Sequence, residues 1–391
     1  MLKKLLLFVF SILVTLFFAE FVFRIYYVTM DKNNYEELLT RLDAGTQRKD
    51  VYRWGLDVIT RSEFEYCLYE NRPNFSGKID FWNCSISNIQ EVKHNADGLR
   101  AERDYPIEKD KSIFKRVAVF GDSGMYGWGL SDDETYSGIL ERLLNDRYQG
   151  RYKFEVINFG VAGYQAIQTM EMFFYKAQKY KPDVVITGTY GLVDLDFGDY
   201  FYPKFSFYQK TSFLLFHFSK YFKRDYYDSV LREFSKKAGI ISTSGNDLEG
   251  SLTRYPQYEK MLGLENARKH MLKLKRYTQE NNIYLLDVFL HFGNNWARTG
   301  RLGGFETPDK TVTDPAERIK RTKEIGIKTI DAFLLAENYL KEKYPAENID
   351  VFETSIFSVN KTDCHPNGMA NFLLAEATVK EMIKDGIIPE D

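Results

Sequence analysis

Residues 117–123 read VAVFGDS, four apolar side chains directly before a glycine, which is typical of a strand buried on both faces of a sheet. Similar runs follow at 154–158 (FEVIN) and 183–187 (DVVIT). The intervening stretches favour helices, one opened by a capping box at 131–134 and one with its apolar side chains over 167–177. Alternating strands and helices predict the α/β class, with a central, mainly parallel sheet between two helical layers.

The alternation is interrupted once and then resumes. Residues 197–256 are rich in Phe, Tyr and Lys, and we interpret them as an insertion that forms a partly helical lobe. The predicted elements beyond it are a helix at about 257–281, a strand at 283–290, one helix from 314 to 343 and a last helix that begins at Pro366. We therefore assign residues 113–391 to the main domain.

The N-terminus has a different character from the rest of the chain. Lys3 and Lys4 precede a mostly apolar run from Leu5 to Phe23, long enough to cross about 30 Å of hydrocarbon. We predict that residues 1–30 form an uncleaved signal anchor, a transmembrane helix that leaves the body periplasmic or extracellular. A cleaved signal peptide is the alternative. Residues 31–112 are predicted to be a helical stalk to about residue 60 and then a loop-rich or small β segment.

Bulk composition excludes some functions. With 44% hydrophobic and 28% charged residues the chain is globular, and a net charge of −2 gives no basic footprint for nucleic acid. Four scattered histidines lack metal-ligand spacing: His94, His217, His270 and His291. Cys67 and Cys84 could form one disulfide in an oxidising compartment, or could remain unpaired. Cys364 next to His365 could be a thiol nucleophile, a reading that we disfavour.

The first strand ends in a candidate nucleophile. Ser123 follows Gly121 at the carboxyl end of the strand, where catalytic groups gather in open parallel sheets. A serine hydroxyl is a weak nucleophile without a base. An ordinary turn is the alternative interpretation of Gly-Asp-Ser.

The base could come from the other end of the chain. His365 lies between Asp363 and Pro366, at the predicted start of the last helix. The helix dipole would keep the imidazole neutral, as a base requires, and Asp363 could orient the ring. The alternative is that His365 only caps the helix.

A third segment follows the second strand. Residues 158–163, with glycines at Gly160 and Gly163, bring bare backbone N–H groups to the same sheet edge as Ser123, where they could stabilise a tetrahedral oxyanion. A glycine-rich strand-to-helix turn fits the same residues.

These three segments, with NADGLR at 95–100, resemble the SGNH (GDSL-like) hydrolases, especially exported bacterial members. The resemblance covers residues 94–195 and 350–385. It implies a three-layer, flavodoxin-like fold and ester hydrolysis without a metal or organic cofactor.

The resemblance also implies specific roles. Ser123 would be the nucleophile of a triad with Asp363 and His365, and the backbone N–H groups of Ser123 and Gly163 would form the oxyanion hole. The chain departs from the family pattern in its third block, because Val193 stands where an oxyanion-binding Asn is expected. Loss of such a donor costs roughly 10²–10³ in rate in other enzymes.

The sequence thus predicts a membrane-anchored serine esterase or deacylase that acts on an acylated carbohydrate or lipid substrate, such as a cell-surface glycan or a lipid-linked substrate. An O-acyltransferase with the same triad is one alternative. The second, motivated by Val193, is a non-catalytic protein that binds a glycan or assists an assembly.

Overall fold

The structure is a computed structural model. It describes residues 8–22 without 9 and 13, 51–53, 58–189 without 63, 65, 66, 68, 82–87 and 165, 264–289, 301–302, 305–306, 315–347 without 346, 356–359 and 365–390. The strands are β1 Val51–Arg53, β2 Ile59–Arg61, β3 Tyr69–Asn71, β4 Ser76–Asp80, β5 Ile89–Lys93, β6 Ile113–Gly121, β7 Lys153–Asn158, β8 Val184–Thr189, β9 Tyr284–Phe289, β10 Arg301–Leu302, β11 Phe305–Glu306 and β12 Lys328–Asp331. The helices are α3 Ser123–Tyr126, α4 Tyr136–Tyr148, α5 Ala166–Met172, α9 Leu264–Glu280, α11 Pro315–Glu324, α12 Ala332–Lys343 and α13 Gly368–Lys384, with short 3₁₀ or π turns at Asp132–Glu134, Phe173–Ala177 and Gln178–Tyr180.

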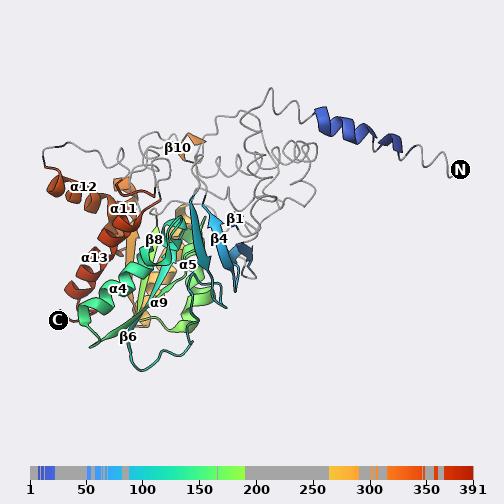
Figure 1. Ribbon diagram of the computed structural model, residues 1–391. Coiled ribbons are helices and arrows are strands. Elements are labelled where there is room, and N and C mark those ends of the chain that lie inside the picture. The colour runs from blue at the N-terminus through green and yellow to red at the C-terminus, as the bar shows by residue number, and fades with distance from the viewer. Residues whose placement is uncertain are drawn as a thin grey trace.

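The main sheet has five strands in the order β12-β9-β8-β6-β7, and each neighbouring pair is parallel. Taken in chain order, β6 comes first and pairs with β7 on one side and β8 on the other (Figure 1). This is the doubly wound arrangement of flavodoxin-like folds, in which the strand order reverses at the first strand. Ligands of such sheets bind outside the carboxyl ends of the strands at that point.

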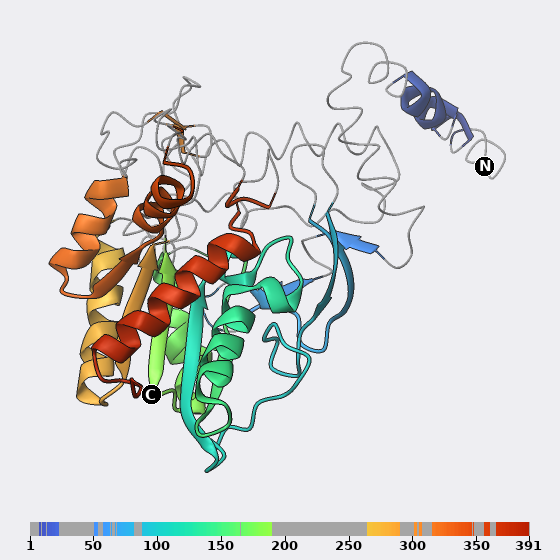
Figure 2. The same cartoon turned by 60° about the vertical axis from the view of Figure 1, so that its left-hand side comes forward.

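Helices cover both faces of this sheet (Figure 2). On one face α5 and α9 pack over a cluster that includes Phe120, Ile157 and Val185. On the other face α4, α12 and α13 cover a second cluster, to which Val119 and Ile186 belong. Side chains that alternate along β6 therefore enter two different cores, which is why its residues 117–120 are all apolar. The prediction of an α/β fold with a parallel central sheet is confirmed.

One predicted helix is wrong. The span 314–343 contains α11, a turn, the edge strand β12 and then α12. Gly326 ends the first helix with a positive φ of 74°, a conformation that glycine adopts at little cost. Ile327 and Ile330 are buried, and Asp331 begins α12 by accepting a hydrogen bond from the Leu334 N–H. The strand escapes sequence prediction because it has only four residues and lies between two helical patterns.

Two helix starts also differ from the sequence prediction. The capping box at Ser131 and Glu134 is present, but it closes only a 3₁₀ turn, and α4 begins after Thr135, whose side chain accepts from the Gly138 N–H. The last helix begins at Gly368, because the Asn367 side chain caps it.

A small β layer precedes the main sheet. β4 pairs with β1 and β5, and β2 pairs with β3, so residues 51–61 contain strands where a helical stalk was predicted. This layer buries Phe75, Ile79 and Phe81 together with Tyr126 of α3, and Trp128 packs against the same cluster. The small β layer therefore supports the turn that follows β6.

The helical segment within residues 8–22 lies away from the sheets in Figure 1. Its large apolar side chains are exposed, with Phe8 at 63% and Phe17 at 70%. Across the ranges that the structure describes, no helix combines the length and apolarity needed for a membrane span.

Cys67 is a buried free thiol in the structure, so the possible disulfide with Cys84 is not formed there. Burial raises the pKa of the Cys67 thiol to about 12. Cys84, Cys364 and the predicted insertion at 197–256 lie outside the described residues.

Candidate active site

The candidate nucleophile lies on a one-turn helix at the carboxyl end of β6. The Asp122 carboxylate caps α3 by accepting a hydrogen bond of 2.8 Å from the Gly124 N–H. Gly127 ends the turn with φ of 89°. The Ser123 carbonyl accepts hydrogen bonds from the N–H groups of Gly127 (3.0 Å) and Trp128 (2.9 Å). Ser123 is thus fixed on a closed turn at the point where the strand order reverses.

Glycines let this turn approach the sheet. A Cβ on Gly121 would lie 2.6 Å from the Gly188 carbonyl oxygen, and one on Gly188 would lie 2.2 Å from the Met125 side chain. A Cβ on Gly160 would come within 2.5 Å of the backbone nitrogen of Tyr126. These distances are too short for any side chain, so the glycines of three neighbouring strand ends allow Met125 to pack down and Ser123 to face outward.

The candidate base enters from the far end of the chain. The Val359 N–H donates to the His365 carbonyl at 2.9 Å, and Ser358 forms an isolated bridge with Pro366. Two residues, Pro366 and Asn367, lie between His365 and the first residue of α13. His365 therefore does not occupy the helix terminus that the sequence predicted. It is held instead by this local pairing ahead of the Asn367 cap.

The structure brings Ser123 and His365 together. Nε2 of His365 lies 2.7 Å from Oγ of Ser123, although the residues are 242 positions apart in sequence. Both residues are partly exposed, so a reactant could reach them. This distance suits removal of the hydroxyl proton by a general base. Asp363, the predicted third member of the triad, lies outside the described residues.

The carboxylate next to the nucleophile has an unusual environment. Burial raises the pKa of Asp122 to about 6, although the hydrogen bond from Gly124 and the nearby His365 both favour the charged form. Its helix-capping contact accounts for its place beside Ser123.

Two backbone N–H groups, those of Ser123 and Gly163, follow strands at the carboxyl edge of the main sheet. The Ser123 N–H is at the start of α3, and Gly163 has φ of 82° in the loop after β7. That loop is anchored beside β6 by a hydrogen bond from the Val161 N–H to the Gly121 carbonyl, 3.0 Å. Among the turn, loop and cap hydrogen bonds of the described residues, neither N–H is used as a donor. Val193 lies outside the described residues.

Asn158 serves the turn rather than a substrate. Its Nδ2 donates to the Met125 carbonyl at 3.0 Å and contacts the Ser137 hydroxyl at 2.9 Å, while Oδ1 accepts from the Gly160 N–H at 2.8 Å. The end of β7 is thereby attached to α3.

The NADGLR segment also braces the turn. The Arg100 guanidinium donates to the carbonyls of Tyr126, Gly127 and Leu130 and pairs with Asp132. Gly98 has φ of 73°, and a Cβ there would lie 2.4 Å from a backbone oxygen. The sequence flagged this segment only through its family resemblance.

Trp128 was missed by the sequence reasoning. Its indole stacks on the His365 imidazole, with ring centroids 5.3 Å apart and planes inclined by 23°. No periodicity marks this residue, because its position depends on how α3 ends.

His94 and His270, the other described histidines, contact protein groups other than Ser123. His94 Nδ1 lies 3.2 Å from the Arg72 carbonyl, so it carries the proton, and Nε2 accepts from the Tyr126 hydroxyl at 2.9 Å. Burial lowers the pKa of His94 to about 3. His270 pairs with Glu171 at 2.6 Å. Among the residues the structure describes, no cluster of three His, Cys, Asp or Glu side chains could hold a metal ion.

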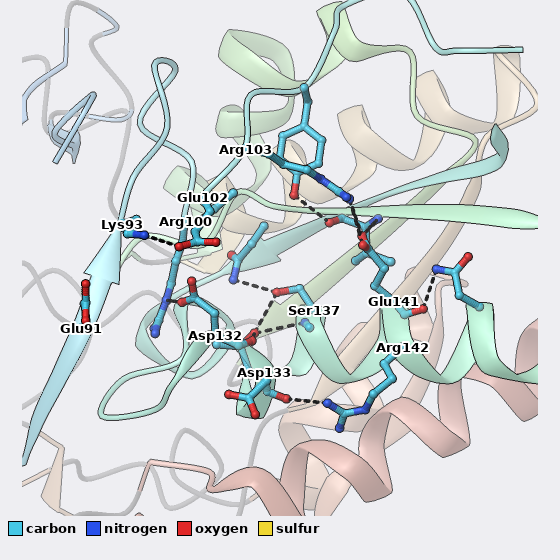
Figure 3. A pocket seen from close by; sticks show the side chains of 17 residues that line it. Glu91, Lys93, Arg100, Glu102, Arg103, Asp132, Asp133, Ser137, Glu141 and Arg142 are labelled. Atoms are coloured by element: carbon cyan, nitrogen blue, oxygen red, sulfur yellow. Dashed lines mark hydrogen bonds and ion pairs between the residues drawn. The ribbon is translucent and has the colours of Figure 1, made fainter. Parts of the chain in front are cut away.

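A polar pocket of about 910 Å³ lies between β5, the Arg100 loop and α4 (Figure 3). Its charged groups largely neutralise one another, as in the pairs Arg103 with Glu141 and Lys93 with Glu102. Neither Ser123 nor His365 lines it. We therefore assign it no part in the candidate site.

No family model and no curated protein matches the chain. Three similar solved structures are a protein described as lipolytic and of the G-D-S-L family from Desulfitobacterium hafniense DCB-2, a lipase/acylhydrolase from Enterococcus faecalis, and an acetylxylan esterase from Geobacillus stearothermophilus. Their identities are 13%, 14% and 15% and their TM-scores 0.37, 0.38 and 0.38; the matches cover 68%, 70% and 69% of this chain and 98%, 97% and 95% of theirs. Similarities this weak establish no activity for this chain.

Proposed function

We propose that this protein is a serine-dependent esterase or deacylase of the SGNH type. The observation that carries the proposal is the 2.7 Å contact between Ser123 Oγ and His365 Nε2 at the carboxyl edge of a parallel sheet. A serine paired with a neutral imidazole becomes a nucleophile, and acyl transfer is the chemistry that such a pair performs.

The proposed reaction begins at this pair. His365 Nε2 accepts the Ser123 hydroxyl proton as Oγ attacks the ester carbonyl. The resulting oxyanion is stabilised by the backbone N–H groups of Ser123 and Gly163. His365 then returns the proton to the leaving alkoxide, so that an alcohol departs and an acyl-serine remains. Water, activated by the same imidazole, releases the carboxylic acid and regenerates the serine.

We assign Asp363 to the third position of the triad, on its sequence position alone. An acid there would hold the imidazole tautomer that leaves Nε2 unprotonated and would stabilise the imidazolium formed during proton transfer. An Asp363→Asn variant with a normal fold and normal turnover would remove this residue from the mechanism.

We propose that the substrate is an acylated cell-surface glycan or an acylated lipid-linked molecule. The protein would reach it while attached to the membrane outside the cytoplasm. The exposed apolar side chains of the segment at residues 8–22, among them Phe8, Phe17 and Phe18, support attachment to lipid. Recovery of the full-length chain in the soluble rather than the membrane fraction of disrupted cells would oppose this part.

The activity test compares the purified full-length protein with Ser123→Ala and His365→Ala on p-nitrophenyl acetate and on an O-acetylated polysaccharide. We expect both variants to lose roughly 10³-fold or more of the turnover, because either member of such a pair is needed for attack. A Ser123→Ala variant as fast as the wild type would remove Ser123 from the mechanism.

The same samples separate the alternatives. An O-acyltransferase would pass the acyl group to an added sugar hydroxyl faster than to water. A protein that binds the polysaccharide but never forms an acyl-serine would be the non-catalytic binding protein that Val193 suggested.

A further inference from the structure

We propose that Trp128 is a positioning residue for His365, resting on the proposed Ser123 and His365 chemistry. Its indole face lies against the imidazole, with centroids 5.3 Å apart and planes inclined by 23°. A ring held on one face has fewer orientations open to it. Contact with Trp128 therefore favours the orientation in which Nε2 points at Ser123 Oγ.

The backbone links Trp128 directly to the nucleophile. The Ser123 carbonyl accepts the Trp128 N–H at 2.9 Å, so one turn fixes both the serine and the indole. The histidine, which comes from the far end of the chain, is thus located by two groups of the same turn: the hydroxyl of Ser123 meets its edge and the indole of Trp128 meets its face.

The small β layer keeps the indole in place. Phe81 packs edge-on against Trp128, with centroids 4.9 Å apart. Asn88 donates to the Gly129 carbonyl at 2.7 Å, and a Cβ on Gly129 would meet that same amide nitrogen at 2.7 Å. The residue after Trp128 is therefore pressed against the β layer, which leaves the indole little room to turn away from His365.

The contact should also favour the transition state. His365 is neutral before attack and becomes an imidazolium while the acyl group is transferred. The negative face of an indole attracts a cation more strongly than a neutral ring. The gain is confined to the charged state, so it raises kcat and leaves substrate binding unchanged. For a partly desolvated cation the expected effect is roughly 2- to 30-fold in rate.

The experiment measures kcat and KM for p-nitrophenyl acetate with the full-length protein and its variants Trp128→Leu, Trp128→Phe and Ser123→Ala. Phe75→Leu is the matched control, because Phe75 belongs to the same apolar cluster but its ring lies against His94. We expect Trp128→Leu to lower kcat roughly 10-fold with KM within about twofold, Trp128→Phe to recover most of the loss, and Phe75→Leu to stay near the wild type.

A spectroscopic measurement reports the stacking itself. With ¹³C-labelled histidine the ring current of the indole shifts the Cε1–H resonance of His365, and that shift should disappear in Trp128→Leu while the His94 resonance stays in place. A wild-type kcat for Trp128→Leu, with Ser123→Ala inactive, would overturn the role of Trp128 alone. Full turnover of Ser123→Ala would overturn the proposed function and this role with it.

Discussion

Replacing Arg100 with leucine should lower the free energy of unfolding by about 3–5 kcal/mol, because three buried carbonyls lose a charged hydrogen-bond donor. The Arg100 side chain is only 1% exposed, and its guanidinium donates to the carbonyls of Tyr126, Gly127 and Leu130. The Gly127 carbonyl keeps the hydrogen bond from the Leu130 N–H (3.2 Å), and the Tyr126 carbonyl keeps a long one from Asn158 Nδ2 (3.5 Å). Hydrogen bonds to charged groups are worth about 1.5–3 kcal/mol each, and these remaining partners hold the total loss to about 3–5 kcal/mol.

The ion pair with Asp132 contributes much less. Asp132 is 44% exposed, and pairs at such sites are worth roughly 0–1 kcal/mol. Asp132→Asn is therefore the matched control, with an expected loss of less than about 1 kcal/mol. Arg100→Lys should fall between the two, because a single ammonium cannot reproduce the planar fork of donors.

Urea denaturation followed by circular dichroism gives the three free energies on one scale. A loss below about 1 kcal/mol in Arg100→Leu, or an equal loss in Asp132→Asn, would show that the carbonyls of the turn do not depend on Arg100.

Three further changes test other parts of the structure. Gly160→Ala should cost about 1–3 kcal/mol of stability and up to about 100-fold in turnover, because its Cβ would displace the α3 backbone; a normal urea midpoint and rate would refute this close packing. The pKa of Asp122 is raised to about 6 in the folded protein, so its contribution to stability is complete below its ordinary pKa of 3.8 and is lost as the pH rises through 6. The free energy of unfolding of Asp122→Asn, plotted against pH, should lack that decline. A curve of the same shape as that of the wild type would contradict the raised pKa. Burial alone would raise the pKa of Glu171, but the hydrogen bonds from His270 and Lys273 outweigh it and hold the pKa below 4.5. Its contribution is therefore present above pH 4.5 and lost as the pH falls through the folded value; the stability deficit of Glu171→Gln should shrink in acid, whereas a constant deficit would contradict this assignment.

The fold was predictable where apolar patterns were strong. β6, β7 and β8 are buried on both faces, so their sequences contrast sharply with the helices between them. β12 was not predictable, because this edge strand of four residues has a single apolar side chain, Ile330, and lies between two helices. Its assignment depends on pairing with β9, which local sequence does not encode.

The residues of the candidate site were easier to predict than the residues that support them. Ser123 and His365 follow from residue type and position at sheet edges, although only the folded chain brings them within 2.7 Å. Trp128 stacks on His365, and Arg100 donates to the Gly127 carbonyl, only because α3 ends at Gly127. A tryptophan or arginine in a loop carries no local sequence signal of such contacts. His365 was placed two residues too close to the last helix, because Pro366 and Asn367 are both good helix starters.

Covalent labelling of the full-length protein by a fluorophosphonate, read by intact mass and peptide mapping, tests directly whether Ser123 is an activated nucleophile. A serine activated by an imidazole reacts with such a probe, whereas an ordinary serine does not. We expect one adduct, located on Ser123, that is absent from Ser123→Ala and forms much more slowly in His365→Ala. A wild-type protein that takes up no label, or takes it up equally when Ser123 is alanine, would contradict it.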